Sequence, residues 1–220
     1  MQLSPLRFSA REKRLSLWLG AASLSFGIFV KITSELLEHE VRGLDSSILI
    51  AVAKMRRPWL TGVAVDVTAL GSITLVALIS AIALCILLSL KDRPAAWQLL
   101  LTSVGAGIWT GITKNIIERA RPEDVTRLVQ VSGFSYPSGH SLVSASLYLT
   151  IALLAARHLP TMKGRILLLG LAVALISLVG MSRVYLGVHY PSDVASGVLL
   201  GVAWALLLAG GFSMIERHVS

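Results

Sequence analysis

The chain has 220 residues, of which 55% are hydrophobic and 15% charged, and its mean hydropathy is +0.75. Soluble domains carry about 25% charged residues, and here the apolar residues also gather in long runs, which indicates a membrane protein. The net charge of +8 does not indicate nucleic-acid binding, because the lysines and arginines lie in short loops between apolar runs. Cys85 is the single cysteine, which excludes a disulfide within the chain and argues against a cysteine-based metal site.

Six apolar runs are each near the ~20 residues that cross a ~30 Å hydrocarbon core as a helix. Helices are expected because backbone polar groups in lipid must be satisfied within the segment. The first run follows a basic segment without a small-residue cleavage pattern, so we interpret it as a retained span. The runs cover residues 15–34, 70–90, 95–113, 139–157, 165–182 and 193–213. The sequence therefore predicts an all-α polytopic membrane protein with six transmembrane helices, forming a single integral-membrane domain over residues 1–220.

The stretch between the first two runs, residues 35–69, has a mixed character. Its segment "LDSSILIAVAKM" has apolar residues at helical spacing, and "RRPW" then interrupts the pattern. This pattern predicts a short amphipathic helix at the membrane interface, and a soluble linker is the alternative.

The charges of the short loops predict the orientation. One group of loops carries ten cations and three acids, a net charge of +7, whereas the other carries ten cations and nine acids, a net of +1. The first group contains Arg7, Arg11, Lys13, Arg14, Lys91, Arg93, Arg157, Lys163, Arg165 and Arg217. The cation counts are equal, but several cations of the second group are candidate ligand-binding residues. We therefore expect cytoplasmic termini and outward-facing loops after the first, third and fifth spans.

Reactive side chains concentrate in two of these outward loops. The loop after the third run begins "KNIIERARP" and ends with "YPSGH", and the loop after the fifth run reads "SRVYLGVHYPSD". Two histidines, an aspartate and several cations thus meet at one membrane face. Ionisable residues at a membrane edge are candidates for function.

The cations among these residues suit a phosphate. Lys114 and Arg121 are seven residues apart and can share one helix face, and Arg183 adds a third positive charge. Ser138 is placed to cap the fourth helix, and Gly139 lets a ligand approach the free backbone N–H groups there. The set predicts an anion site built without a metal ion or other cofactor.

The histidines add the parts of a reaction. His189 and Asp193 are four residues apart, so Asp193 can accept from one imidazole nitrogen and leave the other as a nucleophile. His140 comes from the other loop and can protonate a departing alkoxide as general acid. The cations would stabilise the phosphoryl oxygens during in-line displacement.

Each of these residues also has a simpler interpretation. Lys114 and Arg121 are plausible interfacial anchors, and "PSG" is common at helix starts. These interpretations do not explain why the histidines, the aspartate and the cations all lie on one side of the membrane although they come from separate loops. The other charges receive no functional role here. We expect solvated loop charges at Glu118, Arg119, Glu123, Asp124 and Arg127, interface anchors at Arg56 and Arg57, and surface positions for His39, His158 and His218.

The three segments together resemble the signature of the type 2 phosphatidic acid phosphatase superfamily. The pattern K-x6-R-P, P-S-G-H and S-R-x5-H-x3-D is complete. It is found at Lys114, Arg121 and Pro122, at Pro137, Ser138, Gly139 and His140, and at Ser182, Arg183, His189 and Asp193. Three such motifs in order are far more specific than one. Among bacterial members the chain is most similar to the phosphatidylglycerophosphatase B type, although the loop from Glu123 to Tyr136 is short.

The resemblance implies a metal-independent phosphatase of the bacterial inner (plasma) membrane, with its active site facing the periplasm or cell exterior. It implies that His189 is the nucleophile, Asp193 its partner and His140 the general acid. The phosphate-binding residues would be Lys114, Arg121, Ser138, Gly139 and Arg183. Phosphatidic acid, phosphatidylglycerophosphate and undecaprenyl pyrophosphate are the implied substrates, and the partners are lipids rather than nucleic acids. The sequence makes no prediction of the oligomeric state.

Three alternatives remain open at this point. A lipid phosphotransferase would use the same phosphohistidine with an alcohol in place of water. A vanadate-dependent haloperoxidase shares the anion site, although six spans argue against that typically soluble class. A lipid or anion transporter would use the cations for binding, but it has no need of two histidines about a phosphate.

Overall fold

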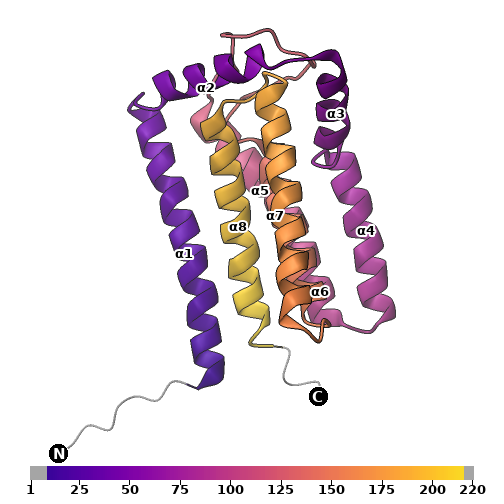
Figure 1. Ribbon diagram of the computed structural model, residues 1–220. Coiled ribbons are helices and arrows are strands. Elements are labelled where there is room, and N and C mark those ends of the chain that lie inside the picture. Colours follow the sequence, from indigo (N-terminus) through magenta and orange to yellow (C-terminus); the bar gives the residue numbers. More distant parts are fainter. Residues whose placement is uncertain (1–8, 216–220) are drawn as a thin grey trace, which may run out of the picture.

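A computed structural model of the protein describes residues 9–215, and within this range the structure contains helices and no strands (Figure 1). The prediction of an all-α protein is confirmed. The helices are α1 (Ala10–Leu37), α2 (Arg42–Lys54), α3 (Pro58–Ala69), α4 (Ile73–Ser89), α5 (Arg93–Ile117), α6 (Gly139–Ala156), α7 (Met162–Tyr185) and α8 (Pro191–Phe212).

Short-range signals set most helix starts. Ser9 and Glu12 form a capping box at α1, in which the serine hydroxyl accepts from the Glu12 amide and the carboxylate accepts from the Ser9 amide. Pro58 and Pro191 occupy the first turns of α3 and α8, where a missing N–H costs nothing. Each of the remaining capped starts has one polar side chain that accepts from a first-turn amide. These N-caps are Ser72, Asp92, Ser138 and Thr161.

Four of the described helices are long and apolar enough to cross a membrane: α1, α6, α7 and α8. The pair α3 and α4, bent by 47° at its break, meets the same standard when taken as one span. Helix α5 is outside this group, since polar side chains such as the buried Gln98 and Thr102 lower its hydropathy. An integral membrane protein is therefore supported, whereas the number of six spans stays a prediction.

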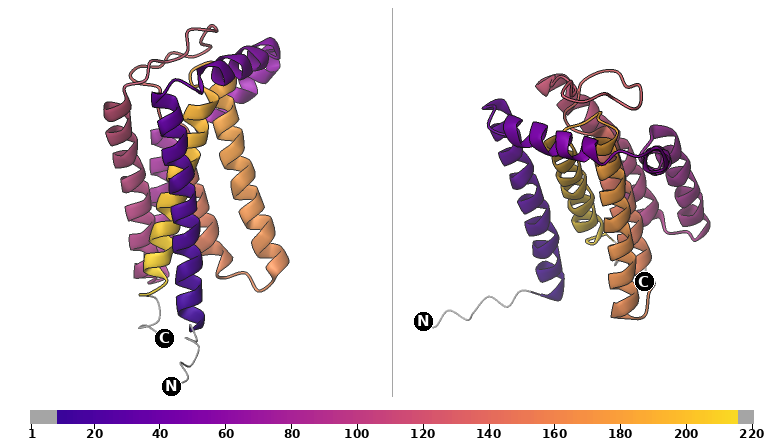
Figure 2. Two further views of the ribbon diagram at one scale, coloured as in Figure 1. Left: turned by 90° about the vertical axis from the view of Figure 1, so that its left-hand side faces the viewer. Right: turned by 45° about the horizontal axis from the view of Figure 1, so that its top comes forward.

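The segment of residues 35–69 is more ordered than either interpretation of the sequence expected. It forms two helices, α2 and α3, rather than one helix or a linker. Helix α2 lies across one end of the bundle, and α3 continues from it towards α4 (Figures 1 and 2). The predicted span of residues 70–90 is thus only the lower part of a bent pair, and its helix begins at Ile73.

Helices α6 and α8 form the centre of the bundle. In α6, 61% of an 18-residue stretch long enough to cross the membrane is buried inside the protein, against 17% of the corresponding stretch in α1 and 22% in α7. Glycines let the two central helices approach closely: a Cβ at Gly197 would lie 2.5 Å from the Ser138 carbonyl oxygen, and one at Gly201 would lie 2.5 Å from that of Leu142. This contact fixes the start of α6 against α8, close to the candidate site.

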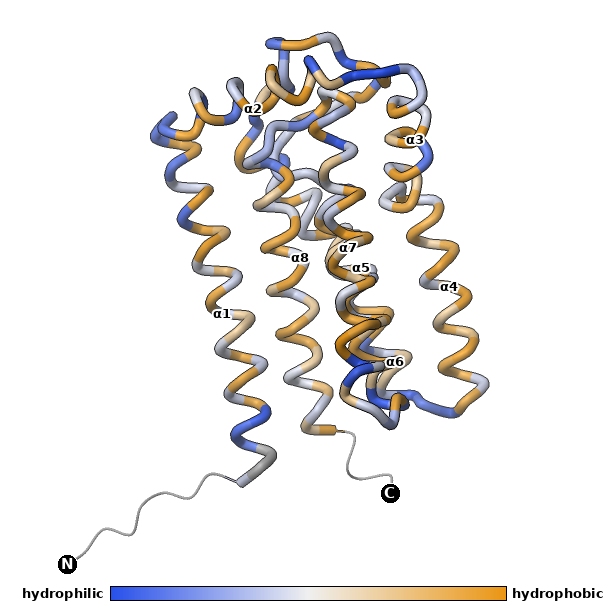
Figure 3. The backbone as a smooth tube through the Cα atoms, in the orientation of Figure 1, coloured by the Kyte–Doolittle hydropathy of each residue, from blue (hydrophilic) through white to orange (hydrophobic). Residues whose placement is uncertain are grey.

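The loops fall into two groups at opposite ends of the bundle. The beginning of α1, the α4–α5 and α6–α7 connections and the end of α8 lie at one end (Figure 1). Helix α2, the segment of residues 118–138 and the α7–α8 connection lie at the other end. Hydropathy along the backbone follows the same division, with apolar stretches between polar ends (Figure 3). The grouping agrees with the charge analysis, except that Arg7, Glu216, Arg217 and His218 lie outside the described residues.

Candidate active site

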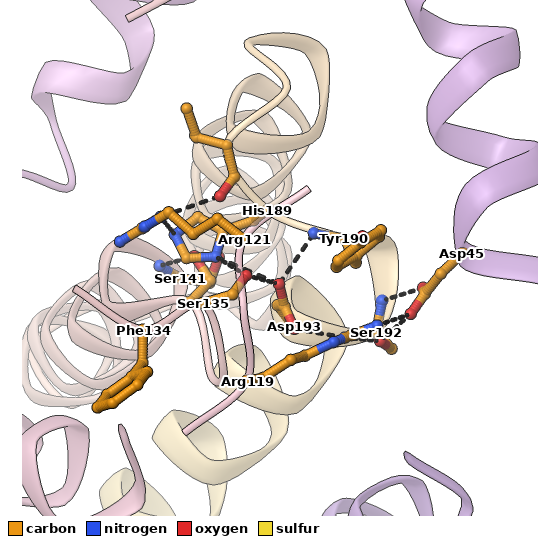
Figure 4. A network of polar contacts seen from close by, with 12 residues as sticks. Asp45, Arg119, Arg121, Phe134, Ser135, Ser141, His189, Tyr190, Ser192 and Asp193 are labelled. Atoms are coloured by element: carbon orange, nitrogen blue, oxygen red, sulfur yellow. Dashed lines mark hydrogen bonds and ion pairs between the residues drawn. The ribbon is translucent and has the colours of Figure 1, made fainter. Parts of the chain in front are cut away.

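The residues of the three sequence motifs meet at the end of the bundle that carries α2. Lys114 lies in the last turn of α5, and Arg121 lies in the segment that follows. Pro137, Ser138, Gly139 and His140 lead into α6, whose N-cap is Ser138. Arg183 lies in the last turn of α7, and Asp193 lies in the first turn of α8. Segments that are far apart in the sequence therefore build one site, and Figure 4 shows three of its motif residues, Arg121, His189 and Asp193.

His189 and Asp193 form an oriented pair. The imidazole Nδ1 lies 3.4 Å from Asp193 Oδ2, and the two side chains are 3% and 0% exposed. The pairing arises because Tyr190 is the N-cap of α8, so that Asp193 falls in the first turn and accepts from the Tyr190 amide at 2.9 Å. Ser135 adds a further hydrogen bond to Asp193 Oδ2, and its hydroxyl lies 3.4 Å from Nδ1.

The second imidazole nitrogen of His189 faces a cation. Its Nε2 lies 3.3 Å from a guanidinium nitrogen of Arg121. Burial lowers the pKa of His189 to about 4, although the neighbouring Asp193 acts in the opposite direction. At neutral pH the ring is therefore uncharged, and with the Nδ1 proton directed to Asp193 the lone pair belongs to Nε2. This is the state that a nucleophilic histidine requires.

The site holds three cations, Lys114, Arg121 and Arg183, and backbone carbonyls hold two of them. Lys114 donates to the carbonyl of Phe134. Arg121 donates to the carbonyls of Ser132, Gly133 and Val188 at 2.9–3.0 Å.

Arg183 differs from the other two cations. It donates to Thr68 Oγ1 at 2.9 Å, while its buried Nε has no partner among the described residues. An unpartnered buried donor beside two further cations suits an anionic ligand.

His140 reaches the same group from α6. The charges of Lys114, Arg121 and Arg183 all act on its ring, as does His189. Its Cβ lies against Gly71, the glycine at the break between α3 and α4. The structure therefore brings together both histidines and all three cations that the sequence indicated.

Ser138 and Gly139 have structural duties in addition to any contact with a ligand. The Ser138 hydroxyl accepts from the Ser141 amide at 3.4 Å and from the Ser141 hydroxyl at 2.9 Å. A Cβ at Gly139 would lie 3.0 Å from a methyl group of Thr110, so the glycine also lets α5 approach. Phosphate binding by these two residues stays a prediction.

Arg119 corrects the sequence analysis. It was expected as a solvated loop charge, but its side chain is only 12% exposed, and it pairs with Asp193 and Asp45 at 2.6 Å and 2.7 Å. Asp45 and Ser135 were also missed, and both are buried. Local sequence could not reveal this network, because Asp45 and Arg119 are 74 residues apart and charge burial leaves no trace in local hydropathy.

Other charges outside the motifs follow the expectation in part. Arg56 donates to the carbonyls of Tyr185 and Thr126. It therefore links the end of α7 to the segment of residues 118–138 and is not a simple interface anchor. Asp124 is exposed, although it accepts from the Tyr190 hydroxyl. His39 and His158 are exposed as predicted, and His218 lies outside the described part of the chain.

Comparison with known proteins places these features in a family. The sequence matches the PAP2 superfamily over residues 95–216. The chain belongs to the PAP2 superfamily. It is 34% identical over 194 residues to phosphatidylglycerophosphatase B of Bacillus subtilis, which covers 87% of this chain and 95% of the relative. It is also 32% identical over 124 residues to an undecaprenyl-diphosphatase of Sulfolobus acidocaldarius, over 54% of this chain and 55% of that protein.

A solved structure supports the same assignment. The crystal structure of a transmembrane PAP2 type phosphatidylglycerolphosphate phosphatase from Bacillus subtilis superposes with a TM-score of 0.83 at 31% sequence identity. The match covers 89% of this PAP2 chain and 98% of that protein. This PAP2 protein is thus a phosphatase of the membrane.

Proposed function

We propose that this PAP2 protein hydrolyses lipid phosphates or pyrophosphates through a phosphohistidine intermediate and without a metal ion. The observation that carries the proposal is the oriented His189, whose Nδ1 faces Asp193 while Nε2 faces the Arg121 guanidinium. Within residues 9–215, no three His, Cys, Asp or Glu side chains are grouped so that they could hold a metal ion. The site is instead built from positively charged donors.

The reaction has two steps. In the first, His189 Nε2 attacks phosphorus, the bond to the lipid oxygen breaks, and His140 donates a proton to the departing oxygen. In the second, His140 accepts a proton from water, whose oxygen attacks the phosphohistidine and releases inorganic phosphate. Lys114, Arg121 and Arg183 stabilise the phosphoryl oxygens in both steps, with Ser138 and Gly139 at the start of α6.

The substrate class follows from the position of the site and from the relatives. The site lies at one end of the apolar helices, where a lipid phosphate meets polar groups while its tails stay among the spans. Relatives are named for phosphatidylglycerophosphate and undecaprenyl diphosphate. We propose that this chain acts on these two classes of lipid and on phosphatidic acid. It would do so as a single domain with six spans, of which α5 is one.

Purified protein in detergent tests this function directly. With EDTA present, we expect inorganic phosphate from phosphatidic acid, phosphatidylglycerophosphate or undecaprenyl pyrophosphate, and inhibition by vanadate. No release from any of the three would refute the proposed hydrolase, and activity lost in EDTA but restored by Mg²⁺ would refute the metal-free mechanism. Appearance of a phosphorylated acceptor lipid in place of inorganic phosphate would identify a phosphotransferase.

We further propose that the protein lies in the bacterial inner (plasma) membrane, with cytoplasmic termini and the site facing outward, as the loop charges indicate. Two exposed positions at opposite ends of the bundle test the orientation: Gln130 near the site, and Lys163 in the first turn of α7. In a Cys85→Ser background, Gln130→Cys should react with an impermeant reagent in intact cells, and Lys163→Cys only after lysis. The reverse pattern would invert the orientation.

A further inference from the structure

Arg119 lies between two carboxylates that come from opposite parts of the chain (Figure 4). One guanidinium nitrogen donates to Asp193 Oδ1 at 2.6 Å, and another donates to Asp45 Oδ2 at 2.7 Å. The guanidinium carbon lies 4.1 Å from the centre of the Tyr190 ring, so the side chain is also stacked. This fork geometry leaves Arg119 little freedom to rotate.

The two oxygens of Asp193 have divided roles. Oδ1 accepts from Arg119, whereas Oδ2 accepts from the Tyr190 amide and the Ser135 hydroxyl and faces His189 Nδ1. Without Arg119, Oδ1 would be a buried acceptor without its charged donor, and the carboxylate would be held through Oδ2 alone. The angle at which Oδ2 meets the imidazole therefore depends on Arg119.

Asp45 completes the arrangement from α2. It is 2% exposed, and its Oδ1 accepts from the Ser192 amide at 2.9 Å. Its Oδ2 accepts from Arg119 and from the Ser192 hydroxyl. Asp45 thus ties both Arg119 and the first turn of α8 to the helix that lies across the end of the bundle.

Charge balance gives a reason for the arrangement. Although burial alone favours its neutral form, the carboxylates of Asp193 and Asp45 raise the pKa of Arg119, which keeps it charged. Removing one member of a buried ion pair leaves an uncompensated charge, which is more disruptive than losing the pair as a whole. The three groups should therefore act as one unit rather than as separate contacts.

We propose that Arg119 and Asp45 are positioning residues for the reaction at His189. Arg119 sets the orientation of Asp193 and, through it, of the imidazole, and Asp45 holds Arg119 in place. The proposal rests on the proposed hydrolysis through His189. Neither residue needs to contact the lipid, so their loss should affect the turnover rate and leave substrate binding unchanged.

The test is steady-state phosphate release from phosphatidic acid by the full-length protein in detergent. We expect Arg119→Met to lower kcat by roughly 10- to 100-fold, the range typical of groups that orient a reactive residue, with KM unchanged. Arg119→Lys, which keeps the charge but not the fork, should recover part of the loss. Asp45→Asn should give a smaller loss, because the amide still accepts from the Ser192 amide but presents no carboxylate to Arg119.

The double variant separates a shared role from two independent ones. If Asp45 acts through Arg119, then Arg119→Met with Asp45→Asn should have a kcat no lower than Arg119→Met alone. Arg165→Met is the control, since Arg165 is also an arginine held by a hydrogen bond, to the Leu159 carbonyl, but it lies at the other end of the bundle. Thermal melting of every variant shows which ones fold. If Arg119→Met does not fold, the kcat values of Arg119→Lys and Asp45→Asn test the positioning role instead.

The outcomes distinguish this proposal from the proposed function. Wild-type protein that releases no phosphate refutes the function itself. If the wild-type protein is active and the folded Arg119 and Asp45 variants have the same kcat as the wild type, the positioning role is overturned. A raised KM with unchanged kcat overturns it as well, because Arg119 would then bind substrate. Additive losses in the double variant overturn the claim that Asp45 acts through Arg119.

Discussion

His189 Nδ1 lies 3.4 Å from Asp193 Oδ2, with both side chains almost fully buried. One nitrogen of the histidine therefore pairs with a carboxylate of the protein, and its other nitrogen, Nε2, faces Arg121. This division suits the nucleophilic role that we propose for the imidazole, and it joins two residues from different structural elements, a loop and the first turn of α8.

The burial of His189 has a consequence for the pH dependence. Its pKa is lowered to about 4, so the ring loses its nucleophilic lone pair only when the pH falls through that value. We expect the acid limb of kcat/KM, which reports the free enzyme, near pH 4 rather than near the ~6.5 of an exposed histidine. The measurement is phosphate release across the acid range.

The lipid phosphate titrates as well, so two substrates are needed. Phosphatidic acid and undecaprenyl pyrophosphate ionise differently, and a limb shared by both belongs to the protein. A shared limb near pH 6.5 would contradict the assignment of a buried, neutral His189.

Gly71 should be sensitive because it touches the residue proposed as general acid. A Cβ there would lie 3.0 Å from His140 Cβ and 2.7 Å from a methyl group of Val179. We expect Gly71→Ala to displace His140 and lower kcat for phosphatidic acid, and to destabilise the protein by about 1–3 kcal/mol through overpacking. The leaving group of p-nitrophenyl phosphate needs no proton. Gly71→Ala should therefore lose less activity on this ester than on the lipid.

Gly62 is the control for this substitution. It lies in α3, and a Cβ there would meet no described atom within 4 Å. Gly62→Ala should therefore keep wild-type activity on both substrates. If Gly71→Ala behaves like Gly62→Ala, the close contact with His140 has no functional weight.

Gly201 offers a test of the packing that supports the site. A Cβ at this position would lie 2.5 Å from the Leu142 carbonyl oxygen, and backbone cannot move aside as a flexible side chain can. We expect Gly201→Ala to separate α8 from α6 and to lower the free energy of unfolding by about 1–3 kcal/mol, seen as a lower Tm in detergent. Gly170→Ala in α7, with no described neighbour within 4 Å, should leave Tm unchanged. Equal Tm values for both variants would argue against close α6–α8 packing.

Hydropathy predicted the long helices well and the short ones poorly. The six apolar runs correspond to α1 and α4–α8, because long apolar segments in lipid have few alternatives to a helix. The break predicted at "RRPW" is confirmed, because α2 ends at Lys54. The helix that follows it was not predicted: Pro58 opens α3, because proline fits the first turn of a helix.

The site shows the same contrast between local and distant information. Spacing alone predicted the His189–Asp193 pair, because the two residues are four apart and α8 begins between them. Arg119 has two candidate environments in sequence, water or a buried ion pair, and only the fold selects between them. Asp45 reaches it from α2, a helix whose place across the bundle end follows from tertiary packing and not from periodicity.

The most direct test of the mechanism is to trap the phosphorylated protein. A lipid phosphate labelled in its phosphoryl group is mixed with excess protein, the reaction is quenched in base, and the labelled peptide is identified by mass spectrometry. We expect an acid-labile, base-stable phosphate on His189, and none in His189→Ala, which should also release no phosphate. Label on another residue, or full phosphate release by the His189→Ala protein, would contradict the phosphohistidine mechanism.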